Sequence, residues 1–269
     1  MSWIAYLEQN QSRFIDELLE FISIPSVSSS DENFQDVVRA GDWVVSRLKS
    51  AGIANARIMA TETHPVVYGD WLNAGDESPT VLIYGHFDVQ PADPLELWDN
   101  PPFEPVIKDE KIYGRGATDD KGNMLAPILA VESLLKSGAK LPVNIKFFFE
   151  GQEEIGSPTL APFVKANSEL LRADMIISAD GSQYGEDQPS LIRGLKGLMG
   201  CEICVTGAKG DQHSGMHGGG IANPVHALSH LIASMKDLEG KINIEGFYDD
   251  VEELKVADQK AIAEIPFDD

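Results

Sequence analysis

A histidine and an aspartate, His86 and Asp88, stand two residues apart at the end of the apolar run VLIYGHFDVQP, residues 81–91. The run is short and rich in β-forming residues, so it predicts a buried strand with the histidine at its tip. Residues two apart on a strand project from the same face, so the two side chains can meet. Such a pair can serve as a tunable base or an oriented metal ligand. A plain hydrogen-bonded pair at a strand end fits it equally well.

Two further apolar runs end in acidic residues. The first, LPVNIKFFFEGQEEIGS, turns from apolar to polar at Glu150 and then carries the neighbouring pair Glu153 and Glu154. The second, MIISADGS, ends on Asp180. The loop GRGATDDKG adds Asp119 and Asp120 ahead of an apolar helix pattern. Ligands of open α/β sheets bind outside the carboxyl ends of the strands, so we expect these acids to gather there with the histidine. Like charges gathered at one sheet edge require a cation.

Helix patterns alternate with the predicted strands. An amphipathic helix occupies the N-terminal segment and should end before Pro25, and a second covers residues 31–52 and stops at Gly52. Residues 56–72 predict a strand pair with a turn near His64. This alternation predicts an α/β fold, with a mostly parallel twisted sheet and helices on both faces.

The character of the chain changes after the third strand, where the polar segment SQYGEDQPS precedes the run LIRGLKGLMGCEICVTG. We place a domain boundary there, which gives a first domain at residues 1–183 and a second at 184–269. The run at residues 191–207 predicts a strand in the second domain. Asn223 followed by Pro224 predicts the start of a helix.

Composition limits the partners of the chain. Its 269 residues include 43 acidic and 21 basic side chains, a formal net charge of -22, and 43% of them are apolar. This length and apolar content suit about two domains with a sizeable core. The negative charge disfavours nucleic acid and anionic membrane surfaces, and no apolar run approaches the ~18 residues of a membrane span. The only cysteines, Cys201 and Cys204, fit a reducing compartment, so we expect a cytoplasmic location.

Five segments, in this order and at these separations, resemble the M20 family of metallopeptidases, and in particular its dipeptidase branch related to carnosine dipeptidases. They are GHFDVQP, GRGATDDKG, GQEEIGS, SADG and DQHSGMHGG. The resemblance implies a zinc exopeptidase-like catalytic domain and an α+β ferredoxin-like lid that also forms a homodimer interface. It also implies two divalent metals, with zinc as the expected ion and manganese as the alternative.

Four metal ligands follow from this resemblance. His86 and Asp180 resemble ligands of one metal, and Glu154 resembles a ligand of the other. Asp119 resembles the carboxylate that bridges the two, which suits a group with two oxygens. The peptide bond from Asp119 to Asp120 resembles one that is cis in this family.

Three further residues resemble parts of the catalytic machinery. Asp88 resembles the carboxylate that orients the histidine ligand, and Glu153 resembles the general base. His213 resembles a lid histidine that reaches the substrate carbonyl, in family dimers from the opposite subunit. If the chain stays extended, Glu153 and Glu154 point in different directions, so one can bind metal while the other accepts the proton of the water.

The implied reaction is metal-dependent hydrolysis of an amide bond in a dipeptide or a small N-acyl amino acid, by a water held between two metals. The family pattern continues past the length of this chain and includes a further metal-binding histidine and an arginine for the substrate carboxylate. We therefore expect the chain to be an N-terminal portion that is inactive alone. The alternative is a non-catalytic module that keeps a partial site to bind metal or a partner.

Overall fold

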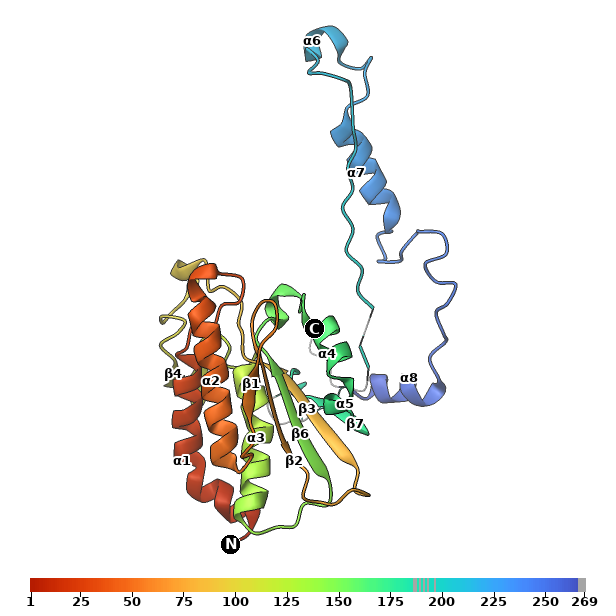
Figure 1. Cartoon of the computed structure of the whole chain (residues 1–269). Helices are drawn as coiled ribbons and strands as arrows, with labels where there is room; N and C mark the ends of the chain where they lie inside the picture. The colour runs from red at the N-terminus through yellow and green to blue at the C-terminus, as the bar shows by residue number, and fades with distance from the viewer. Residues whose placement is uncertain (186–187, 189, 191, 193, 196, 266–269) are drawn as a thin grey trace. The chain divides into compact units, whose positions relative to one another are not determined.

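The computed structural model describes residues 1–185, 188, 190, 192, 194–195 and 197–265, which belong to two units, residues 1–193 and 194–269. Unit 1 is built on a five-stranded sheet with the strand order β1-β2-β6-β3-β7 (Figure 1). The strands are β1 (Arg57–Met59), β2 (Val66–Trp71), β3 (Thr80–His86), β6 (Asn144–Glu150) and β7 (Met175–Ser178). The predicted mixed α/β fold is confirmed.

The three strands that carry the candidate site are parallel and adjacent. β3 lies between β6 and β7, with His86 opposite Glu150 and Tyr84 opposite Ser178. β2 runs antiparallel to β6, and β1 antiparallel to β2, which is the strand pair predicted around a turn near His64. The carboxyl ends of the three site strands therefore meet at one sheet edge, as the sequence predicted.

Helices cover both faces of the sheet (Figure 1). One face packs against α1 (Trp3–Ile22), α2 (Phe34–Ala51) and α3 (Lys121–Lys136), and the other against α4 (Leu160–Ala166) and α5 (Ser168–Leu171). The buried rings of Phe147 and Phe149 belong to the first face, while Phe148 stacks on Phe163 of the second. α2 ends at Gly52, whose φ of 107° is the left-handed conformation that glycine adopts readily. Period-2 alternation along β6 thus divides its aromatic residues between two cores.

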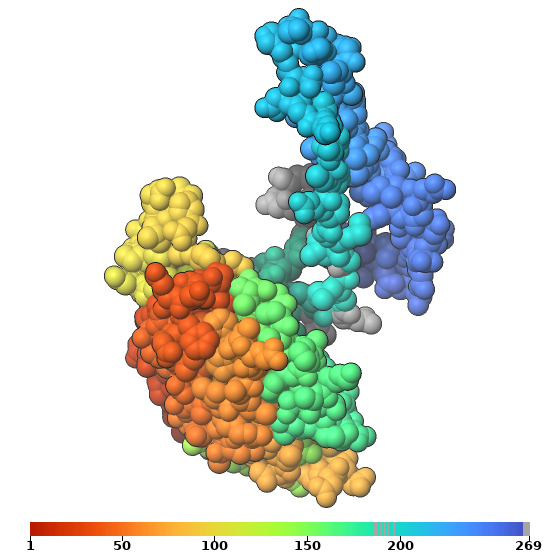
Figure 2. Space-filling view, turned by 45° about the horizontal axis from the view of Figure 1, so that its top comes forward, coloured from red at the N-terminus to blue at the C-terminus, as the bar shows by residue number. Residues whose placement is uncertain are grey.

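Unit 1 also contains a short hairpin that the sequence did not predict. It is formed by β4 (Val106–Lys108) and β5 (Lys111–Tyr113), which pair with each other and with no strand of the main sheet. In the space-filling view, the yellow segment before this hairpin is part of a lobe that projects from the body of unit 1 (Figure 2). The hairpin ends at Tyr113 and leads directly into the GRGATDDKG loop.

A buried ionic network joins the three helices of the first face. Glu132 on α3 accepts hydrogen bonds from Tyr6, at 2.7 Å, and from Arg13, at 2.6 Å, both on α1. Its second oxygen pairs with Arg47 of α2, which also contacts Glu17 at 2.8 Å. The side chains of Arg47 and Glu132 are only 4% and 3% exposed, so each charge depends on the other.

Glu132→Ala should destabilise unit 1 by up to about 3 to 5 kcal/mol, because it removes the buried partner of Arg47 and leaves this arginine only its ion pair with Glu17. Urea unfolding at pH 7 measures this, with Arg39→Ala as the control, since it breaks an exposed pair worth about 0 to 1 kcal/mol. Burial raises the pKa of Glu132, but the hydrogen bonds from Tyr6 and Arg47 outweigh burial and lower it. The stabilisation is therefore present above the unfolded pKa of about 4.3 and is lost as the pH falls through the lower folded value. Equal loss in both variants would contradict the prediction.

The described residues of unit 2 form the helices α6 (Ser214–His217), α7 (Pro224–Met235) and α8 (Val256–Ala263). Asn223 caps α7 by accepting a hydrogen bond from the Val225 amide at 2.9 Å, which confirms the predicted helix start. The strand predicted over residues 191–207 is wrong for the part that the structure describes, which has no strand there. A strand needs a hydrogen-bonded neighbour, and the described part of unit 2 offers only an isolated bridge between Lys236 and Ile242. None of the helices described in either unit is long and apolar enough to cross a membrane.

Candidate metal centre

His86 is the last residue of β3 and is fully buried. The preceding Gly85 lets the start of α3 approach the strand closely, because a Cβ there would lie 2.7 Å from Asp120 Oδ2 and 2.9 Å from Met124 Cβ. Asp120 uses this space to accept a hydrogen bond from the His86 amide at 3.1 Å. The glycine therefore brings the Asp119–Asp120 loop next to the strand end.

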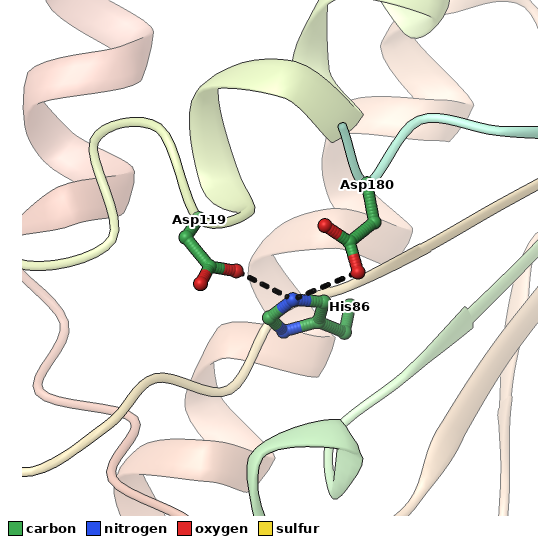
Figure 3. A group of neighbouring side chains, drawn as sticks. All are labelled: His86, Asp119 and Asp180. Carbon is green, nitrogen blue, oxygen red and sulfur yellow. Dashed lines mark hydrogen bonds and ion pairs between the residues drawn. The ribbon is translucent and has the colours of Figure 1, made fainter. Parts of the chain in front are cut away.

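Three potential metal ligands converge on this point (Figure 3). The Nε2 atom of His86 lies 2.9 Å from Asp119 Oδ1 and 3.9 Å from Asp180 Oδ2. The three donor atoms all lie within 4.8 Å of one another, and no other group of this kind is found among the described residues. They come from the end of β3, the loop before α3 and the segment after β7. An imidazole with two carboxylates suits a divalent ion such as zinc.

The electrostatics of the cluster also favour a cation. Burial lowers the pKa of His86, but Asp88, Asp120 and Asp119 outweigh it and raise the pKa to about 10. Burial raises the pKa of Asp120 to about 7, although its hydrogen bond with the His86 amide opposes this rise. The cluster therefore attracts a positive charge, which a proton or a metal ion can supply. A metal ion held by His86 would replace a proton of the imidazole.

Asp88 contacts both the histidine and the glutamate pair. Its carbonyl oxygen lies 3.1 Å from His86 Nδ1, and its carboxylate lies 3.4 Å from the same nitrogen. When Nδ1 donates to Asp88, Nε2 presents its lone pair to the cluster. The two carboxylate oxygens accept the amides of Glu153, at 3.1 Å, and Glu154, at 3.0 Å. One buried carboxylate thus fixes the imidazole and the backbone of both glutamates, and the second contact was not foreseen.

The glutamate pair lies in a 3-10 turn, η3 (Glu153–Ile155), so the chain is not extended there and the condition under which the two side chains would diverge is not met. The amides accepted by Asp88 start this turn, and Gly156 ends it with a φ of 82°. Burial raises the pKa of both Glu153 and Glu154, and the carboxylates around them add to the rise. The Glu154 side chain accepts a hydrogen bond from Gln90 at 2.8 Å, and it is not among the three converging donors.

The loop at Asp119 and Asp120 and the segment around His213 hold the other predicted site features. The peptide bond between Asp119 and Asp120 is cis, as the resemblance implied. Asp120 was noted only as part of an acidic pair, although Gly85 ahead of the histidine signals the close approach that it makes. His213 lies in unit 2 as the cap of α6, where its Nδ1 accepts the Gly215 amide at 3.1 Å, and its catalytic role stays a prediction.

Residues 82–263 match the model of the peptidase family M20/M25/M40, and this match includes every predicted site residue. The chain belongs to this family. It is 35% identical to the Cys-Gly metallodipeptidase DUG1 of Candida albicans, over 97% of this chain and 57% of that protein. It is 33% identical to the Beta-Ala-His dipeptidase of Homo sapiens, over 91% of this chain and 51% of that protein.

Solved M20 structures agree with this assignment. The dipeptidase Dug1p from Saccharomyces cerevisiae matches with a TM-score of 0.78 at 30% identity, covering 98% of this chain and 58% of that one. Human carnosine dipeptidase 1 matches with a TM-score of 0.72 at 29% identity, covering 99% of this chain and 58% of that one. The predicted family is confirmed, and the chain spans a little over half the length of these relatives.

Proposed function

We propose that this chain carries the metal centre of a metal-dependent dipeptidase, which hydrolyses the amide bond of a dipeptide or a small N-acyl amino acid. The observation that carries the proposal is the convergence of His86, Asp119 and Asp180 beside the turn that bears Glu153 and Glu154. Two M20 relatives that act on Cys-Gly and Beta-Ala-His, by their names, support this substrate class.

Membership of the M20 family supports the use of divalent ions, and we propose two of them, with zinc preferred by the imidazole and carboxylate donors and manganese as the alternative. His86 and Asp180 would hold one ion, Glu154 the other, and the two oxygens of Asp119 would serve both. When bound, such ions lower the pKa of a water and polarise the scissile carbonyl.

Two residues beside the metal ligands complete the proposed mechanism. Glu153 accepts the proton of the attacking water, and its raised pKa brings this base closer to neutral pH, where proton transfer is efficient. Asp88 keeps the imidazole and the base in place through the contacts described above. The chain itself therefore supplies the base, its orientation and the metal ligands.

The assignment of the two domains is part of the same proposal. Residues 1–183 would form the catalytic domain, and residues 184–269 would form part of a lid that also mediates homodimerisation. His213 would approach the substrate carbonyl from this lid. A cytoplasmic location is consistent with the two free, exposed cysteines, Cys201 and Cys204.

Amino acid release from a panel of substrates tests the function. The whole protein that contains these residues, supplied with zinc or manganese, should release free amino acids from Cys-Gly and β-Ala-His, whereas this chain alone is expected to be inactive. An N-acetylated amino acid in the panel distinguishes a dipeptidase from a broader acylase. Stoichiometric metal binding without hydrolysis of any substrate would overturn the proposal and favour the non-catalytic binding module.

A further inference from the structure

Glu150 is a buried carboxylate next to the site that the proposed mechanism does not use. It ends β6, is 0% exposed, and lies opposite His86 in the parallel register. One of its oxygens, Oε1, accepts hydrogen bonds from Tyr84 Oη at 2.7 Å and from Ser157 Oγ at 3.0 Å. The other, Oε2, is buried without a hydrogen-bond partner among the described residues. Burying a partly satisfied carboxylate is costly, so its presence requires an explanation.

The two partners of Glu150 belong to different parts of the site. Tyr84 is two residues before the histidine on β3, so both side chains project from the same face of the strand. Ser157 directly follows the glutamate turn and has a φ of 51°, a left-handed conformation that is uncommon for a residue other than glycine. Its amide also donates to the Gln152 carbonyl at 2.9 Å, which closes the turn.

The turn is therefore held at both of its ends. At its start, the carboxylate of Asp88 accepts the two glutamate amides. At its end, the carboxylate of Glu150 accepts the Ser157 hydroxyl and, through Tyr84, connects the turn to the strand that carries the histidine. Both carboxylates are fully buried, so water does not compete for these hydrogen bonds.

We infer that Glu150 is a positioning residue, which holds the general base Glu153 at a fixed distance from the metal ligands by restraining the end of the turn at Ser157. The inference rests on the proposed function for its effect on catalysis, but the restraint itself does not. The restraint requires one fixed acceptor oxygen, Glu150 Oε1, which accepts hydrogen bonds from the hydroxyls of Tyr84 and Ser157.

Glu150→Ala should lower kcat about 10 to 100-fold with little change in KM, because the turn that carries the base moves, while the metal held by His86, Asp119 and Asp180, which lie outside the turn, stays bound. Glu150→Gln keeps an acceptor oxygen and should restore most of kcat. Ser157→Ala should reproduce part of the loss and add nothing in the Glu150→Ala background. Ser137→Ala is the matched control, since its hydroxyl only bonds its own helix, to Leu134 O at 2.9 Å.

Hydrogen exchange of the turn amides provides a readout that needs no activity. The amides of Glu153 and Glu154 should exchange faster in Glu150→Ala and in Ser157→Ala than in the wild type, with unchanged exchange in Ser137→Ala. Full kcat and unchanged exchange in both variants would overturn the inference while leaving the proposed function intact. A wild type without hydrolysis, but with faster exchange in both variants, would overturn the function and support the restraint. A variant that fails to fold is identified by its melting curve, and the milder Ser157→Ala then decides.

Discussion

Glu153→Gln should keep its bound metal and lose about 10² to 10⁴-fold in turnover, the usual effect of removing a general base. The amide keeps the shape of the side chain, and the backbone amide of residue 153 can still donate to Asp88. Only the ability to accept a proton is lost. Elemental analysis after dialysis, together with the rate of dipeptide hydrolysis, measures the two quantities separately.

Glu154→Gln is the matched control, because it makes the same chemical change one residue along the same turn. We expect this variant to lose metal as well as turnover, since a carboxylate ligand becomes a neutral amide. If Glu153→Gln lost its metal and Glu154→Gln kept it, the two roles would be reversed. Gln90 donates a hydrogen bond to the Glu154 carboxylate, and this contact does not involve Glu153. A change at Glu154 therefore leaves the side chain of the base in place.

The strand ends were predictable because their signal is local. A short apolar run fixes a buried strand, parallel strands place their carboxyl ends at one edge, and so His86 and Asp180 meet although they lie far apart in sequence. The pair at residues 153 and 154 follows the end of β6, as the apolar run before it predicted, but the 3-10 turn that it forms was not predicted. The hydrogen bonds from the Glu153 and Glu154 amides to Asp88 span 65 and 66 positions of the sequence. No local propensity encodes such distant contacts.

The features that the sequence did not predict share this cause. Glu132 meets Arg47 across 85 residues, so the buried network of the helices is invisible in the amphipathic patterns that correctly predicted the helices themselves. The apolar pattern of residues 191–207 indicates a strand, but a strand exists only where a neighbour accepts its hydrogen bonds. Periodicity therefore predicts which face of an element is buried, and long-range contacts decide what that face meets.

Asp119→Ala should abolish hydrolysis to the limit of detection, a larger loss than removal of the base. Its carboxylate is the donor nearest to His86 Nε2, at 2.9 Å, and it is the proposed ligand of both metals. A bound metal would lower the pKa of water to about 7, so its loss removes nearly all of the nucleophile at neutral pH. Chelation of the wild type should have the same effect, and zinc or manganese should restore it.

Asp99→Ala is the control for Asp119→Ala. Asp99 is also exposed and lines the same surface cavity as Asp119, and its removal makes the same change in charge. It should keep both metal and turnover.

Metal uptake by the metal-free wild type at pH 7 should also release a proton, because the pKa of His86 is raised to about 10 and the imidazole must become neutral to bind. An unbuffered titration measures this release, and Asp119→Ala should take up little metal and release correspondingly less. Full metal content and turnover in Asp119→Ala would show that the cluster at the end of β3 is not the catalytic centre.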